Sequence, residues 1–194
     1  MKKFLIIFAV VFYTATVFAQ DESGKCSFSV ELDPAPFILG GYSLSVKYLP
    51  EDLSATAFMF SIYTSDFPDA MMSSVNKERG WKNLQLKTSY AFFAEYFFSR
   101  NRTGFYFGPS VFYYNKSVES GLSGESVTFS TLYPNVRAGY VWYPSEDIDL
   151  YINPWLNIGS EINLDKKNEL KGITFKPATV YYIAALHIGY NLNW

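Results

Sequence analysis

Charged side chains within the most regular stretches of the sequence are the first candidates for chemistry. Counted by twos along the chain, each of them falls opposite the apolar residues beside it, as Lys47 does between Val46 and Tyr48. Residues that alternate in this way lie on opposite faces of a β-strand. The set on the less apolar face comprises Glu31, Lys47, Lys87, Glu95, Arg137, Glu161 and His187. The pattern predicts an ionic network on one face of a sheet.

His187 is the only histidine and the natural candidate for a general base. Its position in the two-residue alternation places the imidazole on the charged face. The residue two positions later is Gly189 and not a serine that could act as a nucleophile. The run 121–124, Gly-Leu-Ser-Gly, lacks the flanking pattern of a nucleophile elbow. One histidine and one cysteine supply no metal-ligand cluster. We therefore expect a packed interior histidine, with no catalytic residue, metal or cofactor.

The elements that must position these side chains are strands, and the end of the chain shows the pattern best. Between residues 178 and 194, apolar and aromatic residues recur at every second position and alternate with polar or small ones. A helix repeats near 3.6 residues and would scatter both sets around its circumference. This stretch is predicted to be a long strand with one apolar face, which ends on the aromatic Trp194.

Turn-forming residues divide the rest of the chain into seven further segments of this kind. Short connections at 50–52, 100–103 and 144–147 alternate with longer ones at 64–82, 117–125 and 164–177. The prolines within 33–36 cannot donate to a ladder and so mark another connection. The eight predicted strands are 26–31, 38–49, 53–63, 83–98, 104–116, 126–143, 148–162 and 178–194.

Composition limits the class of protein. Hydrophobic residues make up 49% of the chain and aromatic residues 20%, yet beyond the first residues no stretch approaches the ~18 apolar residues of a membrane-spanning helix. A transmembrane barrel accounts for both facts, because its lipid-facing residues are spread over alternating strands and its rims carry aromatic girdles. A soluble β-sandwich is the alternative, but its interior would then have to hold these carboxylates and cations.

The first residues predict export. Lys2 and Lys3 precede an apolar run, and small residues lead up to Ala19, as in a secretory signal peptide of residues 1–19, with a retained N-terminal anchor as the alternative. The barrel domain would then be residues 20–194, and loss of two lysines changes the formal charge from −2 to −4. Without a basic excess, we expect no nucleic acid partner. The single Cys26 cannot form an internal disulfide.

With its alternating strands, signal peptide and final aromatic residue, the sequence resembles bacterial outer-membrane β-barrels of the small, OmpA-type class. The resemblance implies an all-β fold, an eight-stranded antiparallel up-and-down transmembrane β-barrel, in the outer membrane of a Gram-negative bacterium. It also implies contact with outer-membrane lipids and lipopolysaccharide. Tyr190, Leu192 and Trp194 would form part of the signal for the barrel-assembly machinery.

Three functions fit such a barrel. The first is a structural or surface-interaction role, with the interior plugged by the ionic network, since eight strands enclose a space that side chains fill. The second is a narrow pore gated by exchange of ion pairs. The third is a lipid-modifying enzyme, although members with that activity place a histidine beside a serine. The sequence favours the first.

The connection 64–82 is the predicted place of external recognition. Ser65, Asp66, Pro68 and Asp69 are expected to begin a short helix whose Met71, Met72 and Val75 cap the barrel or meet an extracellular partner. An ordinary solvated loop is the alternative. Asp66 and Asp69 alone are too few oxygen ligands to indicate a calcium site.

Overall fold

The computed structural model describes residues 27–145, 147–165 and 167–192, with the side chain of residue 70 excepted. The predicted signal peptide, Cys26 and Trp194 lie outside the described residues. Among the residues that are described, no helix is both long and apolar enough to cross a membrane.

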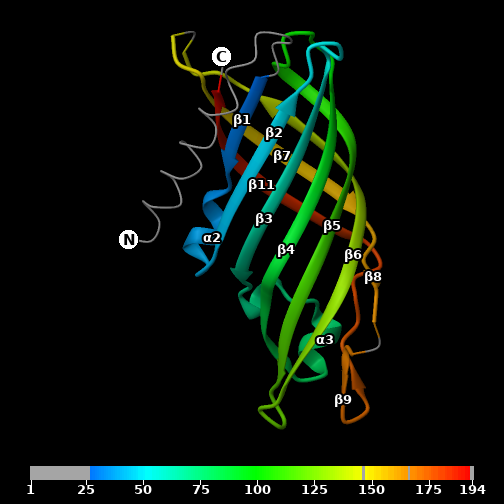
Figure 1. The fold of residues 1–194 in the computed structure, drawn as a ribbon. Coiled ribbons are helices and arrows are strands. Elements are labelled where there is room, and N and C mark those ends of the chain that lie inside the picture. Colours follow the sequence, from blue (N-terminus) through cyan, green and yellow to red (C-terminus); the bar gives the residue numbers. More distant parts are fainter. Residues whose placement is uncertain (1–26, 146, 166, 193–194) are drawn as a thin grey trace.

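In the described part of the chain, eight long antiparallel strands form one closed barrel (Figure 1). Each strand pairs with the next along the sequence, and β11 pairs with both β7 and β1. Closure confirms the predicted fold, because no strand of the ring is left at an edge. The strands are β1 (Ser27–Leu32), β2 (Tyr42–Leu49), β3 (Thr56–Asp66), β4 (Trp81–Phe97), β5 (Gly104–Ser120), β6 (Ser126–Val141), β7 (Leu150–Gly159) and β11 (Tyr181–Leu192).

The two ends of the barrel differ, as the alternation of connections predicted. Short connections at 50–55 and 98–103 and the flanking residues 142–145 and 147–149 share one end with Ser27 and Leu192, and we call it the turn end. The opposite loop end lies toward the bottom of Figure 1. It carries α2 (Pro34–Ile38), η2 (Asp69–Met71), α3 (Ser74–Glu78), β8 (Ile162–Asn163), β9 (Glu169–Leu170) and β10 (Ile173–Thr174). There β4, β5 and β6 continue past the last residues of β3, so that Trp81 pairs with Ser120.

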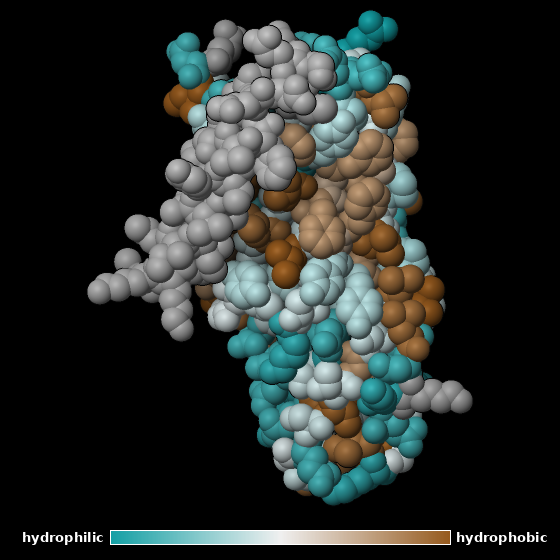
Figure 2. Space-filling view, viewed as in Figure 1, coloured by the Kyte–Doolittle hydropathy of each residue, from teal (hydrophilic) through white to brown (hydrophobic). Residues whose placement is uncertain are grey.

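The barrel is apolar outside, and its interior holds buried charges and polar groups beside aromatic rings. Outward residues such as Phe60, Phe92 and Leu156 remain about half exposed, at 51%, 48% and 52%. Figure 2 shows hydrophobic side chains in a band across the middle of the barrel, with hydrophilic ones gathered toward its ends. Inside, Glu31 and Arg137 are fully buried. A soluble sandwich has the reverse arrangement, whereas a transmembrane barrel has this one.

The predicted start of the second strand at residue 38 is wrong. Residues Pro34–Ile38 form the short helix α2, and the strand begins at Tyr42. Asp33 caps the helix by accepting a hydrogen bond from the backbone N–H of Ala35 at 2.9 Å. Proline is favoured in the first turn of a helix, where its missing N–H would have had no partner. Prolines that indicated a simple connection therefore begin a helix.

Two register shifts in β4 overturn the predicted orientation of Lys87. The ladder between β4 and β5 slips between Lys82 and Gln85 and again between Leu86 and Thr88. A slip of one residue moves every following side chain to the other face. Leu86 is consequently buried and Lys87 is exposed, with its ammonium donating to the side chain of Gln85. Lys87 lies on the outside of the barrel and does not belong to the interior charges.

The contact between β6 and β7 is interrupted twice by proline. Trp142 and Ile152 exchange both backbone hydrogen bonds, at 2.9 and 2.8 Å. Because hydrogen-bonded pairs alternate along an antiparallel ladder, Pro154 and Pro134 both fall at hydrogen-bonding positions in the same register. Neither can donate, and the regular ladder is confined to the pairs from Asn135↔Gly159 to Gly139↔Trp155.

Candidate functional site

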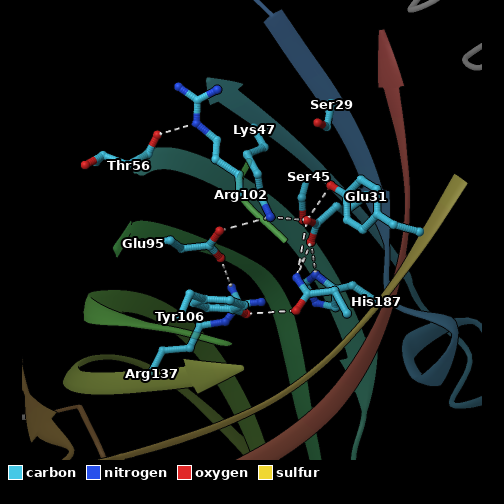
Figure 3. A network of polar contacts seen from close by, with 12 residues as sticks. Ser29, Glu31, Ser45, Lys47, Thr56, Glu95, Arg102, Tyr106, Arg137 and His187 are labelled. Atoms are coloured by element: carbon cyan, nitrogen blue, oxygen red, sulfur yellow. Dashed lines mark hydrogen bonds and ion pairs between the residues drawn. The ribbon is translucent and has the colours of Figure 1, made fainter. Parts of the chain in front are cut away.

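A layer of paired charges crosses the barrel interior near its turn end (Figure 3). Lys47 on β2 forms ion pairs with Glu31 on β1 and with Glu95 on β4, the latter at 2.9 Å. Arg137 on β6 approaches Glu95 at 3.4 Å. All four side chains are at most 2% exposed. Their formal charges cancel, which is the condition under which buried ions are tolerated.

Arg137 is held between aromatic rings as well as by charge. Its guanidinium carbon lies 4.4 Å from the ring centroids of both Phe93 and Trp155. A planar guanidinium stacks on aromatic faces more readily than an ammonium does. The two rings therefore fix the position of the cation along the barrel axis.

His187 joins the layer through Glu31. The Nδ1 atom of His187 is 2.7 Å from one Glu31 carboxylate oxygen, and the hydroxyl of Tyr151 donates to the other at 2.7 Å. Asn153 donates to the same carboxylate from its amide and accepts a hydrogen bond from Tyr106 at 2.9 Å. The imidazole thus faces the interior and contacts a carboxylate, not the lipid-facing surface.

Two glycines make room for the tyrosines of this layer. A Cβ on Gly189 would lie 2.2 Å from the ring of Tyr151, and one on Gly139 would lie 2.3 Å from the hydroxyl of Tyr106. Each tyrosine therefore lies flat against a neighbouring strand where only glycine leaves space. The rings reach Glu31 and Asn153 because of this close approach.

An aromatic layer follows the ionic layer toward the loop end. Phe112 stacks on Tyr114 and contacts Tyr133, with ring centroids 5.7 Å apart in both pairs. Tyr63 meets Phe112 edge-on at 6.3 Å. Tyr133 donates to Asn157 and to the backbone of Tyr181. The middle of the barrel is consequently filled by packed rings.

A second ion pair lies beyond the aromatic layer. Lys116 on β5 pairs with Glu161, and Thr131 donates to the same carboxylate at 2.6 Å. Glu161 is therefore inside the barrel but separate from the central layer. Lys116 was not among the predicted interior residues, although the uninterrupted alternation of β5 places it on the same face as the buried Phe112 and Tyr114. Both faces of β5 carry aromatic residues, so the contrast between apolar and polar positions did not show which face lies inside. Lys116 supplies the third interior cation in place of Lys87.

The loop end is closed by a folded cap, formed by residues 67–80, 164–165 and 167–177 on the extension of β4, β5 and β6. Its buried core comprises Met72, Trp81, Leu84, Val118, Phe129 and Phe175. Asn76 exchanges two hydrogen bonds of 2.9 Å with the backbone of Lys176, and Arg79 donates to the carbonyl of Thr174 at 2.7 Å. These contacts tie the two segments together.

The predicted recognition residues separate into buried and exposed members. Met72 belongs to the cap core, whereas Met71 is 62% exposed. Asp69 accepts a hydrogen bond from the backbone of Asn83 at 2.7 Å, and the exposed Asp66 ends β3. In place of one helix beginning near residue 65, the segment forms η2 and then α3. Only part of this segment is therefore open to a partner.

Tyr190 and Leu192 lie at the turn end of the last strand. Tyr190 pairs with Val30 and is 43% exposed on the outer surface, and Leu192 pairs with Phe28. Both lie on the lipid-facing phase, the placement expected of an assembly signal. Their partner Trp194 lies outside the described residues.

A closed ring of eight antiparallel strands, apolar outside and charged inside, defines a small transmembrane barrel of the kind found in outer membranes. No family model matches the chain, and no curated protein matches it.

Three solved structures are similar to the chain over most of its length. The N-terminal β-barrel domain of Pseudomonas aeruginosa OprF is 16% identical, with a TM-score of 0.49 over 88% of this chain and 100% of that one. Neisserial surface protein A is 12% identical, with a TM-score of 0.42 over 88% and 95%. The attachment invasion locus protein Ail of Yersinia pestis is 13% identical, with a TM-score of 0.44 over 87% and 99%.

Proposed function

We propose that the protein is a closed barrel of the bacterial outer membrane that displays its loop-end cap at the cell surface for interaction. The continuous filling of the interior carries this proposal: an ionic layer, an aromatic layer and a second ion pair follow one another beneath the folded cap. Removal of residues 1–19 by signal peptidase, contact with lipopolysaccharide and insertion by the barrel-assembly machinery belong to the same proposal.

The cap is suited to display because it is held rigidly and still exposes apolar side chains. Its segments are joined by the hydrogen bonds of Asn76 and Arg79. Met71 and Val75 are 62% and 43% exposed, and Leu122 at the tip between β5 and β6 is 78% exposed. Apolar side chains on a rigid support lose little conformational freedom when a partner binds.

Surface labelling of intact cells tests the proposed location and orientation. In a Cys26→Ser background, Leu122→Cys should react with a membrane-impermeant maleimide, and Leu53→Cys should not. Leu53 is the matched control, because it is 50% exposed in a turn of the opposite end. If Leu53→Cys is labelled and Leu122→Cys is not, the protein has the opposite orientation. If neither variant is labelled in cells that contain the protein, surface display is contradicted.

The narrow pore is the second candidate, favoured by the charged interior and by a cavity at the turn end. The aromatic layer argues against it, because exchange of ion pairs around Arg137 would leave Phe112 and Tyr133 in the path. Planar bilayer recordings should show no stable conductance for the unmodified protein. Stable channels that change when Arg137 or Glu95 is replaced would establish the pore instead.

The lipid-modifying enzyme receives less support from the site. His187 lies inside the barrel and contacts Glu31. Acyl chains in the bilayer meet the outer surface, so the imidazole does not face such a substrate. Mass spectrometry of lipid A should give the same acyl pattern with the unmodified protein and with His187→Ala. A protein-dependent change that His187→Ala abolishes would overturn this assignment.

A further inference from the structure

A cavity of about 160 Å³ opens at the turn end, on the far side of Lys47 from the aromatic layer. Its walls come from β1, β2, the turn between β4 and β5, the end of β6, and β7 and β11. The polar residues that matter for its chemistry are Lys47, Asn101, Arg102, Tyr143 and Asn191. A space of this size holds several water molecules, and therefore has room for a small ion with its hydration.

The charge of the cavity lining is one-sided. Of the described residues that line it, Lys47 and Arg102 carry positive charges and none is a carboxylate. Glu31 and Glu95 pair with Lys47 but do not line the cavity. Among these three charged groups, only Lys47 borders the cavity.

Lys47 has a donor to spare. An ammonium group has three N–H donors, and Glu31 and Glu95 account for two of them. Lys47 is only 2% exposed and lines the cavity, so its remaining donor can be used by a group inside it.

Tyr143 provides a second donor, oriented by a chain of hydrogen bonds. Ser29 donates to the side-chain oxygen of Asn191 at 2.6 Å, and this fixes the Asn191 amide so that its nitrogen donates to the Tyr143 hydroxyl at 2.7 Å. Tyr143 accepts that bond and keeps its own proton to donate. Burial raises the pKa of Tyr143, which keeps the hydroxyl protonated.

Arg102 provides a third donor on a fixed support. Its Nε donates to the carbonyl of Thr56 at 3.0 Å, and one Nη binds the carbonyls of Pro50 and Leu53. These bonds use Nε and Nη2, and the Nη1 group of this cavity-lining side chain is not needed for them. The turn is thereby held in place while one end of the guanidinium stays available.

We propose that this cavity is a binding site for a small oxyanion, such as inorganic phosphate or a short carboxylate, with Lys47, Arg102 and Tyr143 as donors. Several donor-bearing side chains line one small space whose charged lining is positive, which is the chemistry that recognises an anion with several oxygen atoms. The site does not depend on the role of the cap. Only the compartment that supplies the anion, the periplasm, rests on the proposed orientation.

Phosphate titration of the folded full-length protein in detergent micelles tests the site. The side-chain amide signals of Asn101 and Asn191 should shift in ¹H–¹⁵N spectra and reach saturation. Tyr143→Phe keeps the ring and removes one donor to a charged group, and should weaken phosphate binding about tenfold. Arg100→Gln changes a charge in the same turn that does not line the cavity, and should leave binding unchanged.

Acetate should produce the same saturable shifts, and chloride should not, if the cavity recognises oxyanions. If Tyr143→Phe does not fold, Asn101→Ala serves as a second variant of a residue that lines the cavity. The proposal is overturned if phosphate causes no saturable shift, if chloride acts as phosphate does, or if Arg100→Gln weakens binding as much as Tyr143→Phe.

Discussion

Replacing Glu31 with a neutral residue should destabilise the barrel strongly, and replacing its partner Lys47 as well should recover part of the lost stability. Glu31 is fully buried and contacts Lys47, His187 and Tyr151. Glu31→Gln keeps the shape of the side chain but leaves Lys47 and Arg137 to share Glu95, so that the layer holds one positive charge without a carboxylate of its own. Removing one partner of a buried ion pair costs about 3–5 kcal/mol, because the other charge stays buried without compensation.

The same reasoning applies from the side of the cation. Lys47→Met leaves Glu31 and Glu95 without the ammonium that they share, and should also cost about 3–5 kcal/mol. In the double variant the layer is neutral again, since Glu95 and Arg137 remain as a balanced pair. The double variant should therefore lose about 2 kcal/mol less unfolding free energy than the two single variants lose together.

Urea unfolding of the protein in lipid vesicles measures these differences. Tryptophan fluorescence and the fraction that migrates in the compact form in unboiled SDS gels should report the same transition, as two-state analysis requires. Glu125→Gln is the control, because its pair with Lys171 is well exposed and should contribute far less to stability than a buried pair does. Single variants that match Glu125→Gln, or a double variant whose effect is the plain sum, would refute the account of the ionic layer.

Three further predictions concern residues that the structure places differently or more exactly than the sequence did. Lys87→Met should change the unfolding free energy by less than about 0.5 kcal/mol. Lys116→Met should lower it by about 3 kcal/mol, because Glu161 then loses its buried partner. The reverse order of these two effects in urea titrations would indicate that Lys87, and not Lys116, lies in the interior. Gly189→Ala should cost about 1–3 kcal/mol by displacing the Tyr151 ring, and a cost that persists in a Tyr151→Ala background would contradict this cause. The hydrogen bond and charge of Lys171 lower the pKa of Glu125 below its ordinary value of 4.5. A lowered pKa in the folded state means that this contact stabilises the cap above the ordinary carboxylate pKa and is lost as the pH falls through the folded value. An NMR titration of Glu125 should show the low midpoint, and Lys171→Ala should return it to the ordinary range.

Two-residue alternation predicted the barrel and most of its interior because both depend on side-chain parity. Glu31, Lys47, Glu95, Arg137 and His187 all come together as the period required. Parity cannot detect an inserted residue, and so the shifts in β4 concealed the true orientation of Lys87.

Contacts between side chains of different strands also could not be predicted from the two-residue alternation. Gly189 reads as a small residue on the inner face, and only the packed strands show that it accommodates the Tyr151 ring. The cap core was predicted only in part: Met72 was expected to cap the barrel, whereas Phe175 comes from a connection that has no period and belongs to this core through packing between distant segments.

The two prolines between β6 and β7 have a consequence for how the ring comes apart. Pro134 and Pro154 each remove one backbone donor from the contact between β6 and β7. The regular ladder of this contact is no longer than the ladder between β11 and β1, where the last and first strands of the ring meet. Strands β7 and β11 pair with each other along most of their length, and are therefore held to the rest of the ring by short ladders on both sides. We expect these two strands to separate from the barrel together on unfolding.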